Sequence, residues 1–175
     1  MKLDLPELLR PIAFIPICLP SGRLFDLPHC YPTLPEWSGP TDVYTFGGKP
    51  LLKYGGAPVF AELYALRLLQ DHGWDGVWVS AYRKKYLQDM PADSKLSNHI
   101  ALKPGHEEII KKIGAKGGGC FDVFAWRGDD VLFCECKRHK RDRLRETQFV
   151  WIDLAVKAGF TNLLVVEWDT AGRRR

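Results

Sequence analysis

Three ionisable residues in the second half of the chain are spaced so that two carboxylates and one amine could meet on paired strands. Asp122 is followed, after twelve intervening residues, by Glu135, and Lys137 stands two places further on. Because side chains on a strand alternate between its two faces, Glu135 and Lys137 share one face of the strand that contains them. Burying a carboxylate and an amine in an otherwise apolar strand costs free energy. Asp122 can reach the same face from a paired strand, which would bring two carboxylates and an amine together.

The surrounding residues predict that these groups lie on a β-hairpin. Two short apolar runs, residues 120–126 and 131–136, flank the turn residues 127–130. Apolar, β-branched and aromatic residues on both sides of a Gly/Asp turn are typical of paired antiparallel strands. Asp122 then lies in the first strand, and Glu135 and Lys137 lie in the second.

A helix is predicted to begin at Pro58, since proline suits the first turn, and to end at Gly73. Glu62 lies in the middle of its apolar stripe, whose other members are Val59, Ala65, Leu66 and Leu69. One explanation is structural: Glu62 pairs with a nearby base or lies at the edge of the stripe. The functional explanation is that Glu62 turns inward towards Asp122 and Glu135.

A second helix with a polar residue on its apolar face is predicted over residues 142–158. Asp142 would cap it and Gly159 would end it. Gln148 shares the inner face with Leu144, Trp151, Ile152 and Ala155. A buried hydrogen bond to the backbone would explain Gln148, and it does not exclude a role at the site.

The residues Asp122, Glu135 and Lys137 resemble the Asp-x(n)-Glu-x-Lys signature of the PD-(D/E)xK nuclease superfamily. Phe121 stands where that signature has proline. The segment after Lys137 is similar to the VRR-NUC branch of this superfamily, in which an Asp, Leu, Gln and Trp pattern opens the second helix. The matching residues here are Asp142, Leu144, Gln148 and Trp151. The chain departs from the branch at residues 138–141, which replace a Gly-containing turn and are one residue longer, and at Arg145, which replaces a serine.

The resemblance implies an α/β fold with the restriction-endonuclease-like αβββαβ core, a mixed central sheet flanked by helices. The expected elements fit that order over residues 57–168: a helix from Pro58, a strand at 76–80, an inserted helix at 104–113, the hairpin, a helix and a strand at 162–168. Residues 57–175 would form the nuclease domain. Residues 1–56 contain nine of the twelve prolines and predict an irregular arm that packs on the domain.

The resemblance also implies roles for the site residues. Glu62, Asp122, Glu135 and the carbonyl of Cys136 would bind Mg²⁺ or Mn²⁺. Lys137 would orient the attacking water, and Gln148 would hold Lys137 or a substrate phosphate. The products would carry 5′-phosphate and 3′-hydroxyl ends.

The charge is concentrated directly after the Glu-x-Lys motif. The net charge of the whole chain is only +4, but residues 137–145 hold six Lys or Arg against one Asp. A solvated loop is the ordinary explanation of such a run. Beside an acidic site, it is what a polyanionic substrate requires. The residues expected to contact DNA are Arg138, Lys140, Arg141, Arg143 and Arg145.

The five cysteines do not suggest a disulfide framework. Cys134 and Cys136 lie ~6.6 Å apart along one strand, too far for a comfortable bridge. A zinc site at Cys18, His29 and Cys30 would lack a fourth ligand. A reducing, cytoplasmic setting is therefore expected. No apolar stretch approaches the ~20 residues that a membrane span needs, so no membrane partner is expected.

Three functions remain open at this point. The first is a metal-dependent DNA endonuclease that acts on duplex DNA or on branched or flapped structures. The alternative is a catalytically inactive nucleic-acid-binding domain of the same fold, and the third is an unrelated α/β interaction module. The sequence leaves open whether the chain works alone or as a homodimer.

Overall fold

The computed structural model describes residues 3–80, 82–114 and 121–171. Its helices are η1 (Glu7–Leu9), α1 (Ala61–Asp71), α2 (Pro104–Ile113) and α3 (Glu146–Lys157). Its strands are β1 (Ala13–Cys18), β2 (Leu24–Cys30), β3 (Thr33–Leu34), β4 (Leu52–Tyr54), β5 (Ala57–Val59), β6 (Asp75–Ser80), β7 (Lys85–Leu87), β8 (Val123–Arg127), β9 (Asp130–Arg138) and β10 (Leu163–Thr170).

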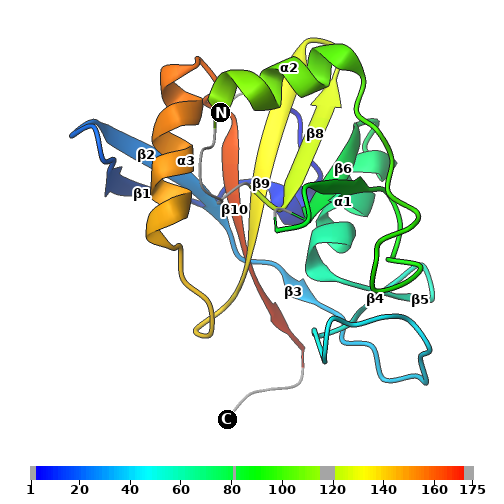
Figure 1. Cartoon of the computed structure of the whole chain (residues 1–175). Coiled ribbons are helices and arrows are strands. Elements are labelled where there is room, and N and C mark those ends of the chain that lie inside the picture. Colours follow the sequence, from blue (N-terminus) through cyan, green and yellow to red (C-terminus); the bar gives the residue numbers. More distant parts are fainter. Residues whose placement is uncertain (1–2, 81, 115–120, 172–175) are drawn as a thin grey trace.

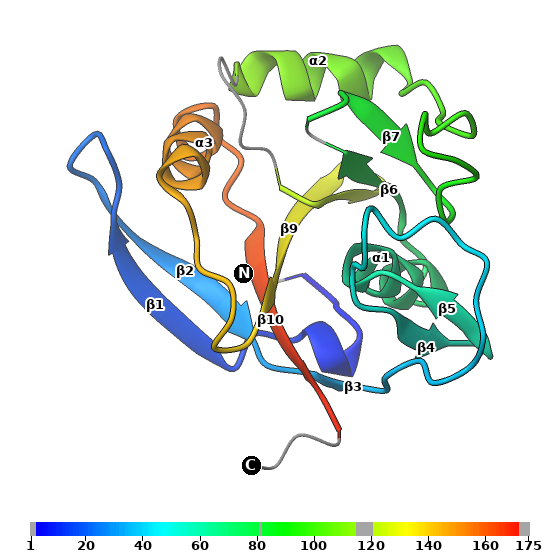
Figure 2. The same cartoon turned by 60° about the horizontal axis from the view of Figure 1, so that its bottom comes forward.

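A mixed sheet forms the centre of the molecule, with helices on both of its faces (Figure 1). Its strand order is β1-β2-β10-β9-β8-β6-β7, and β3 pairs with β10. One apolar cluster packs α1 against the sheet, and a second cluster packs α2 and α3 against the opposite face. Figure 2 shows α1 on one side of β9 and β10 and α3 on the other. The predicted mixed α/β class is confirmed.

The predicted hairpin is present. β8 and β9 pair antiparallel across a two-residue turn, and Gly128 in that turn has φ of +59°, a left-handed conformation that glycine adopts without a steric penalty. Asp122 precedes β8 by one residue, whereas the sequence predicted that it lies within the strand. Cys120, the predicted first residue of that strand, lies outside the described residues.

The crossover after the hairpin places β10 beside the strand that carries Glu135. α3 connects β9 to β10, and the two strands pair in parallel with Glu135 opposite Val165 and Lys137 opposite Glu167. The apolar residues of β10 suit this central position, because a strand inside a sheet is covered on both faces. The elements predicted from α1 to β10 follow in the expected order, and β7 is an additional strand.

Part of the N-terminal segment, residues 13–34, forms strands rather than an irregular arm. β1 and β2 form an antiparallel hairpin, β2 continues the main sheet in parallel with β10, and β3 pairs with β10 further along. Prolines in this segment argued against strands. Pro16 is nevertheless compatible with β1, because an edge strand has a row of backbone N–H groups that need no partner in the sheet.

Two predicted helix starts are wrong. α1 begins at Ala61 rather than Pro58, because Ala57–Val59 pairs with β4 in a separate two-stranded sheet. α3 begins at Glu146 rather than near Asp142. The Asp142 side chain instead accepts the backbone N–H of Arg138 at 3.0 Å, which stabilises a turn in the loop before the helix.

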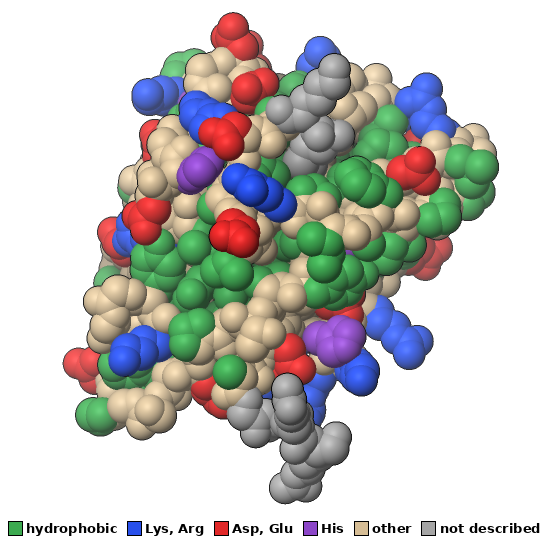
Figure 3. Space-filling model, turned by 180° about the vertical axis from the view of Figure 1, so that it is seen from behind, with side chains coloured by type: hydrophobic (Ala, Val, Ile, Leu, Met, Phe, Trp, Pro, Cys, Tyr) green, Lys and Arg blue, Asp and Glu red, His purple; other side chains and the backbone are tan. Residues whose placement is uncertain are grey.

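Large apolar side chains remain exposed on the β1–β2 hairpin, notably Ile12, Phe14 and Leu24. Hydrophobic side chains are also visible across much of the face seen from behind, with charged side chains between them (Figure 3). Among the described residues, no helix has the length and apolar character to cross a membrane.

Candidate active site

A cavity of about 650 Å³ collects the residues that the sequence singled out. It lies where α1, the residue before β8, the end of β9 and the start of α3 meet. Its lining includes all five expected catalytic residues, namely Glu62, Asp122, Glu135, Lys137 and Gln148. Arg141, Arg143 and Arg145 from the loop between β9 and α3 line the same cavity.

Glu135 is the most deeply buried acid of this cavity. Its side chain is 2% exposed, and its Oε1 accepts a hydrogen bond from Gln148 Nε2 and lies 2.6 Å from Lys137 Nζ. Burial raises the pKa of Glu135, while the ammonium group of Lys137 opposes that rise. Oε2 of Glu135 is buried without a hydrogen-bond partner. Oε1 of Glu135 therefore has two partners, whereas Oε2 has no hydrogen-bond partner.

Two hydrogen bonds to backbone N–H groups hold Asp122 in place directly before β8. Its Oδ2 accepts the N–H of Cys136 at 2.9 Å, and its carbonyl accepts the N–H of Val79 at 2.7 Å. Burial raises the pKa of Asp122 well above its ordinary value, and the carboxylates of Glu135 and Glu62 raise it further. The carboxylates of Glu62, Asp122 and Glu135 therefore repel one another electrostatically when they are ionised.

Glu62 is buried on α1 and turns towards the cavity, as expected. Its Oε1 forms an ion pair with Lys49, while its Oε2 is buried without a partner. Both explanations of Glu62 hold, since it has a local base and also lines the site.

Lys49 is the main residue of the site that the sequence reasoning missed. It comes from the loop between β3 and β4, where its backbone N–H bonds to the carbonyl of Thr45 at 2.8 Å. Burial alone would lower the pKa of Lys49, but the Glu62 carboxylate outweighs it and raises that pKa. A single lysine in a Gly-Gly-Lys-Pro turn has no periodicity that would have placed it here.

The chemistry of the acids suits a hard divalent cation. Carboxylate and carbonyl oxygens are the ligands that Mg²⁺ and Mn²⁺ prefer, and Glu62 and Glu135 each present an unpartnered buried oxygen. The Cys136 thiol is not a candidate ligand, because burial raises its pKa well above the ordinary value and keeps it protonated. The positions of the side chains match a metal site less well than their ligand types do. Within residues 3–80, 82–114 and 121–171, no three His, Cys, Asp or Glu side chains are grouped to hold a metal ion.

Gln148 connects the site to the backbone of α3. It stands at the third position of the helix, where its Oε1 accepts the N–H of Arg145 at 2.9 Å. Its Nε2 donates to Glu135. The predicted hydrogen bond to the backbone is therefore present, and it is partly buried. The other partner is Glu135, however, whereas the sequence suggested Lys137 or a phosphate.

The five basic residues after Lys137 separate into three groups. Arg141, Arg143 and Arg145 line the cavity. Lys140 lies at a neighbouring cavity, which Arg143 also lines. Arg138 instead packs its guanidinium over the Trp168 ring, 5.5 Å from the ring centroid.

The zinc alternative finds no support in the described part of the chain. Cys30 belongs to the apolar cluster on the α1 face of the sheet, and Cys18 is exposed. His29 instead faces Glu167, with 3.9 Å between its Nδ1 and Oε2 of Glu167.

No protein-family model matches this chain, and neither does any curated protein or solved structure.

Proposed function

We propose that this chain is a metal-dependent nuclease that hydrolyses phosphodiester bonds in DNA, built on a restriction-endonuclease-like core. One observation carries the proposal. Four separate segments of the chain deliver Glu62, Asp122, Glu135, Lys137 and Gln148 to a single cavity. Buried acids that converge with amines and an amide in one cavity are typical of sites that bind a charged ligand. The arginines at the same cavity provide the charge that a phosphate backbone requires.

The chain's own residues have distinct roles in this proposal. Glu62, Asp122, Glu135 and the carbonyl of Cys136 would hold Mg²⁺ or Mn²⁺. Such an ion polarises a phosphate oxygen and lowers the pKa of a bound water. Lys137 would orient the attacking water and offset the negative charge that develops on the phosphate.

The remaining side chains would position the acids and the substrate. Gln148 holds the carboxylate of Glu135 through a hydrogen bond that is already formed. Arg141, Arg143 and Arg145 would bind backbone phosphates on either side of the cut. The products would carry 5′-phosphate and 3′-hydroxyl ends, and branched or flapped DNA is the substrate class to test first.

A second candidate is a nucleic-acid-binding domain of the same fold that lacks catalysis. Lys49 pairs with Glu62 and Lys137 pairs with Glu135, so two acids of the cavity already have cationic partners. In a site that binds nucleic acid without cutting it, these two lysines could neutralise the acids in place of a metal ion. The two candidates differ in whether the protein takes up a divalent cation and whether it cuts.

The deciding experiment is a cleavage assay on a panel of single-stranded, duplex, flapped and branched DNAs with Mg²⁺, with Mn²⁺ and with a chelator. Cleavage that needs the metal and falls by about 100-fold or more in Glu135→Gln is expected, because a neutral amide is a poorer metal ligand than a carboxylate. Glu146→Gln is the matched control, since Glu146 is exposed at the start of α3 outside the cavity. DNA binding without cleavage of any substrate would favour the inactive binding domain. A protein that neither binds nor cuts DNA would favour the third function, an unrelated α/β interaction module.

A further inference from the structure

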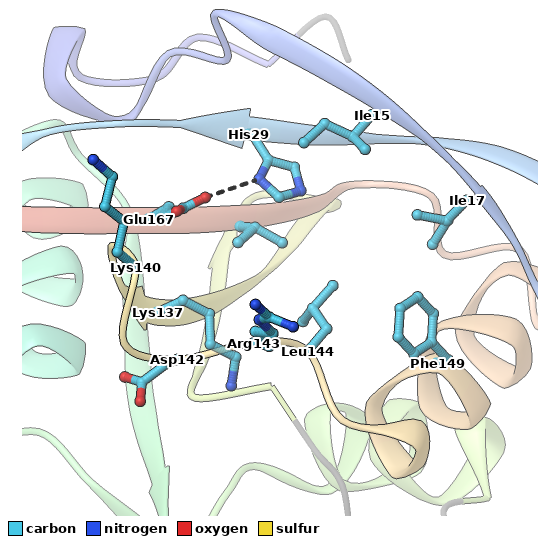
Figure 4. A pocket seen from close by; sticks show the side chains of 11 residues that line it. Ile15, Ile17, His29, Lys137, Lys140, Asp142, Arg143, Leu144, Phe149 and Glu167 are labelled. Atoms are coloured by element: carbon cyan, nitrogen blue, oxygen red, sulfur yellow. Dashed lines mark ion pairs between the residues drawn. The ribbon is translucent and has the colours of Figure 1, made fainter.

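A second cavity of about 570 Å³ adjoins the candidate active site. Lys137, Asp142 and Arg143 line both cavities, so an occupant of one lies directly beside an occupant of the other. Figure 4 shows this space between β1, β2 and the start of α3. The β1–β2 hairpin, which the predicted core does not include, therefore supplies one of its walls.

The walls of this second cavity are mostly apolar. Ile15 and Ile17 come from β1, Leu144 from the loop before α3, Phe149 from α3 and Val165 from β10. Figure 4 shows Ile17 of β1 and Phe149 of α3 at the edge of this space. Ile15 is still 37% exposed, and Phe149 is partly exposed. An apolar ligand with flat faces would cover these side chains, and the aromatic ring of Phe149 offers a surface for stacking.

The cavity also has positive charge that the protein itself does not use. Lys140 and Arg143 line this cavity, and within the described residues their side chains form no ion pair and no hydrogen bond. Neither of its two acids is paired with these cations: Asp142 accepts the N–H of Arg138, and Oε1 of Glu167 lies 2.6 Å from Nδ1 of His139. A phosphate can therefore approach Lys140 and Arg143 without displacing an internal partner.

We infer that this second cavity binds one unpaired nucleotide of the substrate strand next to the phosphate that is cut. Its volume lies in the usual range for small-ligand sites. Its apolar walls suit a base, and its free cations suit the attached phosphate. A base inside a duplex is stacked and paired, so only an unpaired or extruded base could enter. The position of the cut in this inference rests on the proposed nuclease function. The substrate would then be a nucleic acid that is single-stranded at the cut.

The test compares binding of a short oligothymidylate with binding of a blunt duplex of the same length, with Ca²⁺ present to prevent cleavage. Phe149→Ala should weaken oligothymidylate binding roughly 5- to 150-fold through lost stacking, and it should leave duplex binding unchanged. Val150→Ala is the matched control, because Val150 is the next residue of α3, is exposed and does not line the cavity. Thermal unfolding checks that each variant is folded.

A second pair of variants tests the opposite wall and does not depend on α3. Ile15→Asp places a carboxylate in the cavity, whereas Phe14→Asp places one on the neighbouring exposed residue of β1 that does not line it. Only Ile15→Asp should weaken oligothymidylate binding. Photo-crosslinking of a 5-iodouracil oligonucleotide should label peptides from β1 or α3.

The outcomes separate this inference from the proposed function. Equal losses for oligothymidylate and duplex, or equal effects of Phe149→Ala and Val150→Ala, would overturn the nucleotide site even if the protein cuts DNA. If the protein cuts no nucleic acid while the selective losses remain, the nuclease proposal fails and the cavity stands as a single-strand binding site. Crosslinks confined to other segments would also overturn the inference.

Discussion

Gln148 connects the start of α3 to the catalytic strand β9 through a single side chain. Its Nε2 donates to Oε1 of Glu135, and its own Oε1 accepts the backbone N–H of Arg145 at 2.9 Å. The second bond satisfies one of the N–H groups that a helix start leaves without a partner. The orientation of the Glu135 carboxylate and the position of α3 therefore depend on the same amide.

Replacing Gln148 should reduce stability as well as activity. Gln148→Leu keeps a similar volume but leaves the Arg145 N–H and one buried oxygen of Glu135 without this partner. The free energy of unfolding should fall by about 1–3 kcal/mol, measured by urea denaturation. Val150→Ala is the control, because Val150 is exposed on α3 and lines neither cavity. Equal changes in the two variants would mean that the bonds of Gln148 add nothing.

Lys137 should be needed for cleavage but not for metal uptake. Lys137→Met removes the ammonium group that lies 2.6 Å from Glu135, so the chemical step should slow by about 100-fold or more. Metal affinity, measured by calorimetry, should be unchanged or higher, because a competing cation beside Glu135 is lost. Lys111→Met on the exposed surface of α2 is the control. A variant that cuts at the parent rate would remove Lys137 from the mechanism.

Lys49 should compete with a divalent cation for Glu62. Lys49→Met removes the cation from the Glu62 carboxylate, so Mg²⁺ should bind more tightly while the metal-free protein loses about 1–2 kcal/mol of stability. Calorimetric titration and urea unfolding with and without Mg²⁺ measure both effects. Lys53→Met is the control, since Lys53 is exposed on β4 and does not line the cavity. Weaker Mg²⁺ binding in Lys49→Met would show that Lys49 supports the metal site.

His106 should make stability depend on pH. Its ring lies 3.9 Å from the Trp126 ring, centroid to centroid. Burial lowers the pKa of His106 below its ordinary value of 6.5, Lys103 lowers it further and Asp75 opposes the shift. When the pH falls below 6.5, the unfolded chain takes up the proton before the folded one, so stability decreases.

His106→Phe should remove this part of the pH dependence and keep the aromatic contact. Urea midpoints measured from neutral to mildly acidic pH should fall less steeply for the variant than for the parent. His29 is expected to persist as a second source of the same trend, because burial lowers its pKa as well. Parallel curves for parent and variant would contradict the assignment to His106.

The parts of this molecule that could be predicted are those in which burial imposes a local pattern. The hairpin and β10 are short apolar runs bounded by turn residues, and Glu62 and Gln148 were noticed because they interrupt apolar helix faces. The strands β1 and β2 were missed because prolines argue against strands, while the pairing of β2 with β10 is a long-range contact that leaves no local pattern. Lys49 was missed for the same reason, since only the folded chain brings its loop to α1.

The basic loop between β9 and α3 provides its own control for DNA binding. Arg141 and Arg143 line the candidate active site, whereas Arg138 is packed over Trp168. If Arg141 and Arg143 contact phosphates, each Ala variant should shallow the plot of log affinity against log salt by about 0.9 on duplex DNA, and the double variant by twice that. Arg138→Ala should leave the slope unchanged, because its guanidinium lies over the Trp168 ring and Arg138 lines neither cavity. Binding measured in Ca²⁺ at several salt concentrations gives these slopes. Parallel lines for all variants and the parent would mean that the loop is a solvated surface, and only the acidic site would then support a nucleic-acid substrate.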